Sequence, residues 1–188
     1  MKELIPISKL NDFDFCPYSI YLQNVYMDTD GDLYRAQPQT RGHNAHRKVD
    51  DKMTSTSNNV IESLPVISQE LGLYGKIDVY DSAKKRLIER KFSLKNLFRG
   101  KYYQLWAQYF CLIEMGYVVN SIAFYEISTH KTIEIPVPQK EQRIELGRII
   151  EAYLNFDPKS PINVNHNKCT HCIYCNLCDK TDEDNVYS

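Results

Sequence analysis

The sequence predicts a single mixed α/β domain in which a central sheet is flanked by helices. Its 188 residues are 43% hydrophobic and 25% charged, which suffices for one buried core. Segments with strand-like alternation are interleaved with segments whose apolar residues recur at helical spacing. Seven Gly and eight Pro exclude collagen-like or low-complexity architecture. Since we find neither an apolar run of about 20 residues nor an N-terminal signal region, we expect a cytoplasmic protein with no membrane partner.

Each predicted element follows from local signals. In chain order we expect a helix over residues 8–24, a loop over 27–38, a polar helix over 39–54, strands over 60–67, 73–80 and 86–92, a helix over 102–117, strands over 118–127 and 132–137, and a helix over 138–156. Ser8 is the expected N-cap of the first helix, and Pro17 predicts a kink in it. Pro138 suits the first turn of the last helix.

Charge is distributed unevenly along a chain whose net charge is only −1. From Lys84 to Lys101, eight basic residues face a single acid, Glu89, so this strip carries +7. Such a strip is either a solvated surface or a track for a phosphate backbone.

A carboxylate–lysine pattern lies on the two strands predicted over 73–80 and 86–92. If they pair as a hairpin, Asp78 lies beside Glu89, and Lys91 shares the face of Glu89 while Arg90 points the other way. Two carboxylates bind a hard ion such as Mg²⁺ or Mn²⁺. A lysine on the same face orients or deprotonates a water, or neutralises charge on a phosphoryl transition state. Alone the pattern is weak, because Glu-x-Lys is frequent in charged proteins.

The order of neighbouring motifs resembles the RecB-like branch of the PD-(D/E)xK nuclease superfamily. The matching residues are Gly42 and His46 for the Gly-x-x-x-His helix, Asp78 for the second motif, Glu89 and Lys91 for the third, and Gln104 for the fourth. The resemblance implies that His46, Asp78 and Glu89 bind Mn²⁺ or Mg²⁺, and that Asp78, Glu89, Lys91 and Gln104 form the catalytic set.

One position departs from the pattern of that branch. Relatives usually carry Tyr four residues after the Gln, whereas this chain has Gln108 there and Tyr109 next. His43 lies one turn before His46 but lacks the motif spacing, so we interpret it as a residue of the helix surface.

Five of the six cysteines form a second pattern. Cys169, Cys172, Cys175 and Cys178 follow one another at intervals of three, and Cys16 lies near the N-terminus. In a reducing compartment such clusters bind Zn²⁺ or an iron–sulfur cluster, and spacing alone does not distinguish the two. Cys111, in an apolar helical segment, reads as a buried core thiol.

The cysteines strengthen the resemblance. RecB-like nucleases with Phe-x-x-Cys-Pro near the N-terminus and Cys-x₂-Cys-x₅-Cys near the C-terminus hold a [4Fe–4S] cluster. The resemblance therefore implies the ligands Cys16, Cys169, Cys172 and Cys178. Cys175 is then surplus, with its exchange for Cys178 as the alternative. Residues 1–25 and 158–180 would form an iron–sulfur flap that joins the two ends of the chain around a 39–156 nuclease core, all within one domain over 1–188.

The compact size and motif set resemble the CRISPR-associated nuclease family Cas-four. The resemblance implies a DNA exonuclease, or an endonuclease that processes single-stranded overhangs, which trims prespacers beside the Cas-one and Cas-two integrase in antiviral defence. Two alternatives are a non-catalytic subunit that recognises DNA overhangs and a zinc-stabilised adaptor.

The basic strip supplies the expected DNA contacts. We expect Arg90, Lys95, Arg99 and Lys101 to contact the phosphate backbone. Aromatic residues adjoin the strip and either stack on unpaired bases or belong to the core: Tyr102, Tyr103, Trp106 and Tyr109. For Tyr103 and Trp106 we favour the core.

Overall fold

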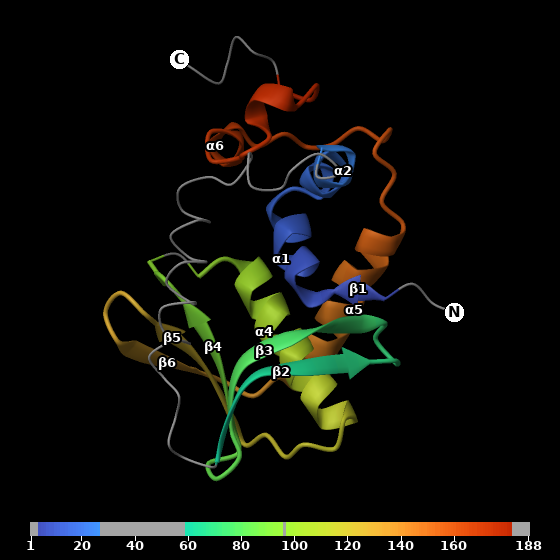
Figure 1. The fold of residues 1–188 in the computed structure, drawn as a ribbon. Helices are drawn as coiled ribbons and strands as arrows, with labels where there is room; N and C mark the ends of the chain where they lie inside the picture. Colours follow the sequence, from blue (N-terminus) through green and yellow to red (C-terminus); the bar gives the residue numbers. More distant parts are fainter. Residues whose placement is uncertain (1–3, 27–58, 96, 182–188) are drawn as a thin grey trace.

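The computed structural model describes residues 4–26, 59–95 and 97–181, and the predicted mixed α/β class is confirmed. Figure 1 shows the sheet with helices packed against it. The strands are β1 (Ile5–Pro6), β2 (Val60–Ser68), β3 (Leu73–Asp81), β4 (Arg86–Lys91), β5 (Ser121–Glu126) and β6 (Lys131–Ile135). The helices are α1 (Ile7–Phe15), α2 (Pro17–Tyr26), α4 (Arg99–Glu114), α5 (Lys140–Leu154), α6 (His166–Cys169) and the 3₁₀ turn η1 (Cys175–Leu177). Within these described residues, no helix is long and apolar enough to span a bilayer.

The six strands form one mixed sheet in which β3 is central. β2 pairs antiparallel along one edge of β3, whereas β1 and β4 share its other edge. β4 then pairs with β5 in parallel, and β6 pairs antiparallel with β5. The parallel β4–β5 pair requires a crossover, which α4 supplies.

The predicted 39–54 helix, with Gly42, His43 and His46, lies outside the described residues.

The predicted first helix is two helices. The backbone is extended at Cys16 (φ −160°, ψ 114°), and Pro17 begins α2. Proline disfavours helical geometry in the residue before it, so the expected kink is a full break. The Ser8 cap was wrong, because α1 begins one residue earlier, after Pro6.

Helices α4 and α5 begin at residues other than those predicted from local sequence signals. α4 starts at Arg99 rather than at residue 102, and its Gly100 amide donates to Asp14 Oδ2 at 3.0 Å, a cap supplied by α1. α5 starts at Lys140, two residues after Pro138, and its N-cap Gln139 donates its amide to Gln142 Oε1 at 2.9 Å. Each helix is thus capped by a residue that a proline or charge pattern does not reveal.

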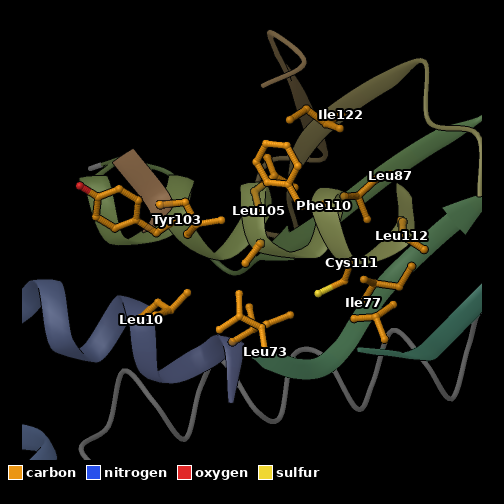
Figure 2. Close-up of a cluster of buried hydrophobic side chains, with 14 of the residues drawn as sticks. Leu10, Leu73, Ile77, Leu87, Tyr103, Leu105, Phe110, Cys111, Leu112 and Ile122 are labelled. Atoms are coloured by element: carbon orange, nitrogen blue, oxygen red, sulfur yellow. The ribbon is translucent and has the colours of Figure 1, made fainter. Parts of the chain in front are cut away.

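The main core lies between the sheet and helices α1, α4 and α5. Figure 2 shows Leu10 of α1, Leu73 and Ile77 of β3, and Leu105 and Leu112 of α4 converging there. Cys111 is fully buried among them, as predicted for a core thiol. A second, smaller cluster joins α2 to the C-terminal segment through Tyr18, Leu22 and Tyr174.

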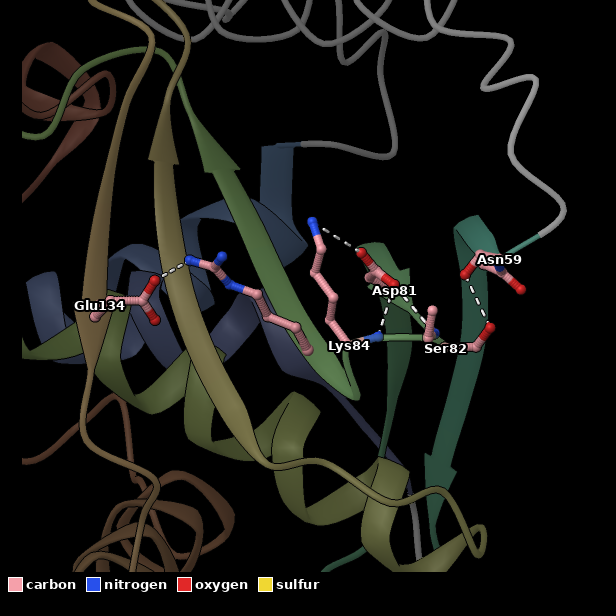
Figure 3. A network of polar contacts seen from close by, with 7 residues as sticks. Asn59, Asp81, Ser82, Lys84 and Glu134 are labelled. Atoms are coloured by element: carbon pink, nitrogen blue, oxygen red, sulfur yellow. Dashed lines mark hydrogen bonds and ion pairs between the residues drawn. The ribbon is translucent and has the colours of Figure 1, made fainter.

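The predicted hairpin between β3 and β4 is confirmed. Asp81 Oδ1 accepts the amides of Ala83 and Lys84, and the backbone of Lys85 is left-handed (φ 53°), which closes the turn. Figure 3 shows the Lys84–Asp81 ion pair beside this turn, and a separate pair between Arg86 and Glu134 on β6. Part of the basic strip is therefore neutralised within the protein.

Candidate metal and nucleic-acid site

The β3–β4 ladder ends at the point where Asp78 lies. Strand β4 pairs with residues 79–81 of β3 and β1 pairs with residues 73–74, so the backbone between these two partners is open on that edge. Asp78 Oδ2 accepts the Arg90 amide at 2.7 Å in place of the next ladder bond. Across from Asp78 in the β2 register, Ser63 has a left-handed backbone (φ 53°), a conformation that is uncommon outside glycine. The sheet is thus irregular at this carboxylate.

Glu89, the residue opposite Asp78 at the opening of the hairpin, has donors on both carboxylate oxygens. Gln104 Nε2 and Lys91 Nζ each lie 2.7 Å from Oε1. Gln108 Nε2 donates to Oε2, also at 2.7 Å. Lys91 Nζ donates in addition to Gln104 Oε1 at 2.9 Å, which closes a Glu–Gln–Lys triangle. The carboxylate and the ammonium group are therefore fixed relative to each other.

The charged groups of this site are partly or fully removed from solvent. Glu89 is 2% exposed, while the Lys91 side chain retains 23% exposure at the edge of the site. Burial, and next the nearby charge of Glu89, raise the pKa of Asp78 to about 8. The buried Glu89 carboxylate and the half-buried Asp78 carboxylate repel each other, and a bound cation would relieve that repulsion. Their hard oxygen donors fit Mg²⁺ or Mn²⁺.

The third predicted ligand, His46, lies outside the described residues. Among the side chains that the structure does describe, no three His, Cys, Asp or Glu residues are grouped so as to hold a metal ion. The described part of the site therefore consists of the Asp78 and Glu89 carboxylates with Lys91 and Gln104 beside them.

Arg90 is placed differently from the predicted DNA contact. It is only 4% exposed and forms an ion pair with Glu62 on β2, so its guanidinium lies inside the protein. Because Arg90 alternates with Glu89 and Lys91 along β4, it points to the other face of the sheet, as the strand pattern predicts. The DNA-binding assignment of Arg90 was wrong, since a buried and paired guanidinium does not reach a phosphate backbone.

The other three predicted DNA contacts lie after β4. Lys95 is exposed, and Arg99 pairs with Glu145 at 2.6 Å while 71% of its side chain remains accessible. Lys101 is half-buried, and its pKa is lowered by burial and then by the charge of Lys91, which places it near that lysine.

The predicted stacking aromatics of α4 belong largely to the core. Tyr103 is 3% exposed and donates to Glu145 Oε1 at 2.9 Å. Tyr102, Trp106 and Tyr109 are partly buried against the same core. The preference for a core role of Tyr103 and Trp106 is confirmed.

The segment that carries the C-terminal cysteines lies beside α2, at the end of α1 that points away from the sheet (Figure 1). Burial raises the pKa values of Cys169, Cys172 and Cys178, and Cys16 adds to all three shifts. Cys16, Cys172 and Cys178 also pack against the same small hydrophobic cluster of Tyr18, Leu22 and Tyr174. Thiols are soft donors that suit an iron–sulfur cluster or zinc. Among the described side chains, however, no three of these cysteines are grouped so as to hold a metal ion.

Backbone hydrogen bonds order the C-terminal cysteines. The amides of Cys172, Cys175 and Cys178 donate to the carbonyls of Cys169, Cys172 and Cys175 at 2.9, 3.2 and 3.3 Å. Bonds between residues i and i+3 bring every third side chain to one side of the chain. Each interval of three is thus closed as a turn, and residues Cys175–Leu177 form a 3₁₀ helix.

Polar contacts tie this segment to the N-terminal helices. Lys168 Nζ donates to the carbonyls of Asp14 and Phe15 at 3.1 and 3.0 Å, at the C-terminal end of α1. Tyr18 Oη donates to Asp179 at 2.5 Å. The single helix predicted over residues 8–24, as part of the flap, is thus two helices with different partners. α1 packs in the main core, and α2 packs against the C-terminal segment.

Two residues of the site were not predicted to have a role there. Gln108 lies one turn after Gln104, and that spacing already indicated a shared helix face. Glu126 pairs in register with Lys91, and its Oε1 accepts the Leu94 amide at 2.7 Å, which holds the chain after β4. No sequence signal connects Glu126 to this site, because the parallel β4–β5 pairing alone brings it there.

No family model and no curated protein sequence matches the chain significantly. Among solved structures, it is similar to the crystal structure of a protein designated SSO0001. The TM-score is 0.62 at 17% identity over 96% of this chain and 88% of that one. At this identity the similarity shows a shared fold.

Proposed function

We propose that this protein is a metal-dependent DNA nuclease with a RecB-like core. The observation that carries the proposal is the closed triangle of Glu89, Lys91 and Gln104 beside Asp78, at the point where the β3–β4 ladder ends. A largely buried pair of carboxylates next to a fixed ammonium group suits phosphodiester hydrolysis, in which negative charge develops on the phosphoryl oxygens. A structural role alone does not require a lysine that is both hydrogen-bonded and accessible.

Each described residue has a defined task in this mechanism. Asp78 and Glu89 would hold Mn²⁺ or Mg²⁺, with His46 as the expected third ligand, and the ion would supply Lewis-acid activation and charge neutralisation. Lys91 Nζ orients the attacking water or donates to a phosphoryl oxygen, and Gln104 Oε1 fixes its direction. Gln104 Nε2 donates to Glu89 Oε1 and Gln108 Nε2 donates to Glu89 Oε2, so the two glutamines hold the carboxylate.

The cysteine segment is proposed to be an iron–sulfur flap. The packing of Cys16, Cys172 and Cys178 against one hydrophobic cluster supports this set of ligands, and the chain offers four thiols from both ends of the domain. The bound cluster would supply a structural cross-link between α2 and the C-terminal segment.

The biological setting follows from the motif resemblance. We propose that the substrate is single-stranded DNA or a DNA overhang, and that the protein trims prespacers beside the Cas-one and Cas-two integrase.

The direct test is cleavage of end-labelled single-stranded DNA by protein purified without oxygen, with added Mn²⁺. The wild type is expected to cleave, and Glu89→Gln, which keeps the shape of the side chain, is expected to lose cleavage. Glu134→Gln on exposed β6 is the matched control. Equal cleavage by wild type and Glu89→Gln would refute this site. DNA binding without cleavage by either protein would instead favour the recognition-subunit alternative.

Metal analysis of the same preparation tests the flap. We expect iron and acid-labile sulfide, whereas zinc without iron or sulfide would favour the adaptor alternative.

A further inference from the structure

Two phenylalanine side chains project from the segment between β4 and α4. Phe98 is 64% exposed, the largest exposure among the large hydrophobic residues that the structure describes, and Phe92 is 41% exposed. Phe92 directly follows Lys91, and Phe98 is the N-cap residue of α4, the helix that carries Gln104. Both rings thus belong to the chain that connects the two halves of the Glu–Gln–Lys triangle.

The backbone that carries these rings is fixed. The Ser128 amide donates to the Phe92 carbonyl at 3.1 Å, and the Lys101 amide donates to the Phe98 carbonyl, also at 3.1 Å. Between them, Leu94 is buried in the main core and its amide donates to Glu126. The backbone is therefore held at both Phe92 and Phe98, and an exposed aromatic ring on a held backbone loses little conformational entropy when it binds.

Cationic side chains alternate with the two rings. Lys95 is exposed between them, and Arg99 directly follows Phe98 with most of its side chain accessible. Lys91 precedes Phe92 and retains partial exposure, so a further cation lies at the start of this segment. Isolated rings separated by cations differ from the contiguous apolar patches that mark protein interfaces. Positive charge combined with stacking rings is the pattern that proteins use for single-stranded nucleic acid.

We propose that Phe92 and Phe98 stack on unpaired bases of single-stranded DNA and guide the strand to the Asp78–Glu89 site. This inference rests on the proposed nuclease function and assigns its substrate-binding surface. The stacking role expected for the aromatic residues of α4, whose rings pack against the core, is thereby assigned to Phe92 and Phe98, whose rings are exposed. The neighbouring Lys95 and Arg99 hold the phosphates, and the rings recognise the base faces without sequence preference.

The test is fluorescence anisotropy with a labelled oligothymidylate and an abasic oligonucleotide of the same length, without added divalent metal so that the DNA stays intact. The wild type is expected to bind the base-containing strand more tightly. Phe98→Leu is expected to weaken that binding about 5- to 150-fold, the loss of one base–aromatic stack, and to leave binding of the abasic strand unchanged. Phe92→Leu is expected to act likewise, and Phe98→Trp to restore affinity.

Tyr74→Leu, a change at an exposed tyrosine near the start of β3, is the matched control and should bind both strands like the wild type. Equal affinity of the wild type for both strands, or wild-type affinity of the Phe92→Leu, Phe98→Leu double variant, would overturn the stacking proposal. If the wild type cleaves DNA and the double variant binds normally, this inference alone fails. If ring-dependent binding is found but no cleavage with Mn²⁺, the nuclease proposal fails and this surface stands.

Discussion

The two candidate sites of this protein differ in how firmly contacts within the protein fix their functional side chains. At the carboxylate–lysine site, Glu89 already has three donors within 2.7 Å, and the Asp78 carboxylate accepts the Arg90 amide. At the cysteine site no three of the described side chains are grouped so as to hold a metal ion, and the segment is held by backbone turns and a small hydrophobic cluster.

The difference follows from the elements that build each site. A hairpin and a long helix fix the first site, since strands and helices hold side chains more rigidly than loops do. The second joins α2 to a segment whose helices span three or four residues. We therefore expect the first site to be preorganised and the second to be completed by its cofactor.

The largest expected effect is on catalysis at the preorganised site. Lys91→Met removes the ammonium group but keeps the length of the side chain, so Mn²⁺-dependent cleavage should fall about 10²- to 10⁴-fold. Single-turnover cleavage measures this, and circular dichroism should show an intact fold. Lys76→Met, at an exposed position of β3, is the control. Activity of Lys91→Met within a few-fold of the wild type would exclude this lysine from the mechanism.

The next effect concerns the cofactor-dependent site. Cys16→Ser should lose iron and sulfide, and lower the Tm by about 5–10 °C, because the cross-link between α2 and the C-terminal segment is lost. Cys175→Ser should retain both. Iron content and thermal unfolding measured without oxygen distinguish these outcomes. Loss of iron in Cys175→Ser would favour the alternative in which Cys175 replaces Cys178 as a ligand, and full iron content in Cys16→Ser would exclude Cys16 from the ligand set.

A smaller effect is expected at Gln108, which lies one helical turn after Gln104 on α4 and also donates a hydrogen bond to Glu89. Gln108 is 1% exposed, and Gln108→Leu deletes its hydrogen bond to a buried carboxylate. We expect a loss of about 1–3 kcal/mol in the free energy of unfolding, with reduced cleavage. Urea unfolding and cleavage rates measure the two effects. Unchanged values for both would mean that Gln104 and Lys91 alone fix Glu89.

The smallest effect is expected at Glu114, which lies outside both candidate sites. Glu114 at the end of α4 accepts the amides of Gln69 and Glu70 at 2.8 and 3.2 Å and a hydrogen bond from Ser68, which joins α4 to the β2–β3 turn. Although partial burial opposes ionisation, these hydrogen bonds lower the pKa of Glu114 below 4.5.

A lowered pKa gives stability that is present above the unfolded-state value near 4.5 and is lost as the pH falls through the folded-state value. Glu114→Gln should therefore be about 1 kcal/mol less stable than the wild type at pH 7, with the difference shrinking below about pH 4.5. Urea unfolding at a series of pH values measures this. A difference that does not depend on pH would show that the charge contributes nothing.

The sequence predicted those features that local periodicity controls. Alternation along residues 86–91 placed Glu89 and Lys91 on one face and Arg90 on the other, and the ion pairs agree. It could not predict that Glu62 would bury Arg90, because that partner comes from a separate strand. The cap of α4 by Asp14 and the exposure of Phe98 likewise depend on contacts between distant parts of the chain. Strand β1 has two residues, too few to show a period.

Hydrogen exchange tests the contrast between the two sites most directly. We would compare the cluster-containing protein with protein whose cluster has been removed by a chelator. The Arg90 amide, which donates to Asp78, should exchange slowly and equally in both forms. The amides of Cys172, Cys175 and Cys178 should gain strong protection only with the cluster bound. Loss of protection at Arg90 on cluster removal, or equal protection of the cysteine amides in both forms, would contradict the account.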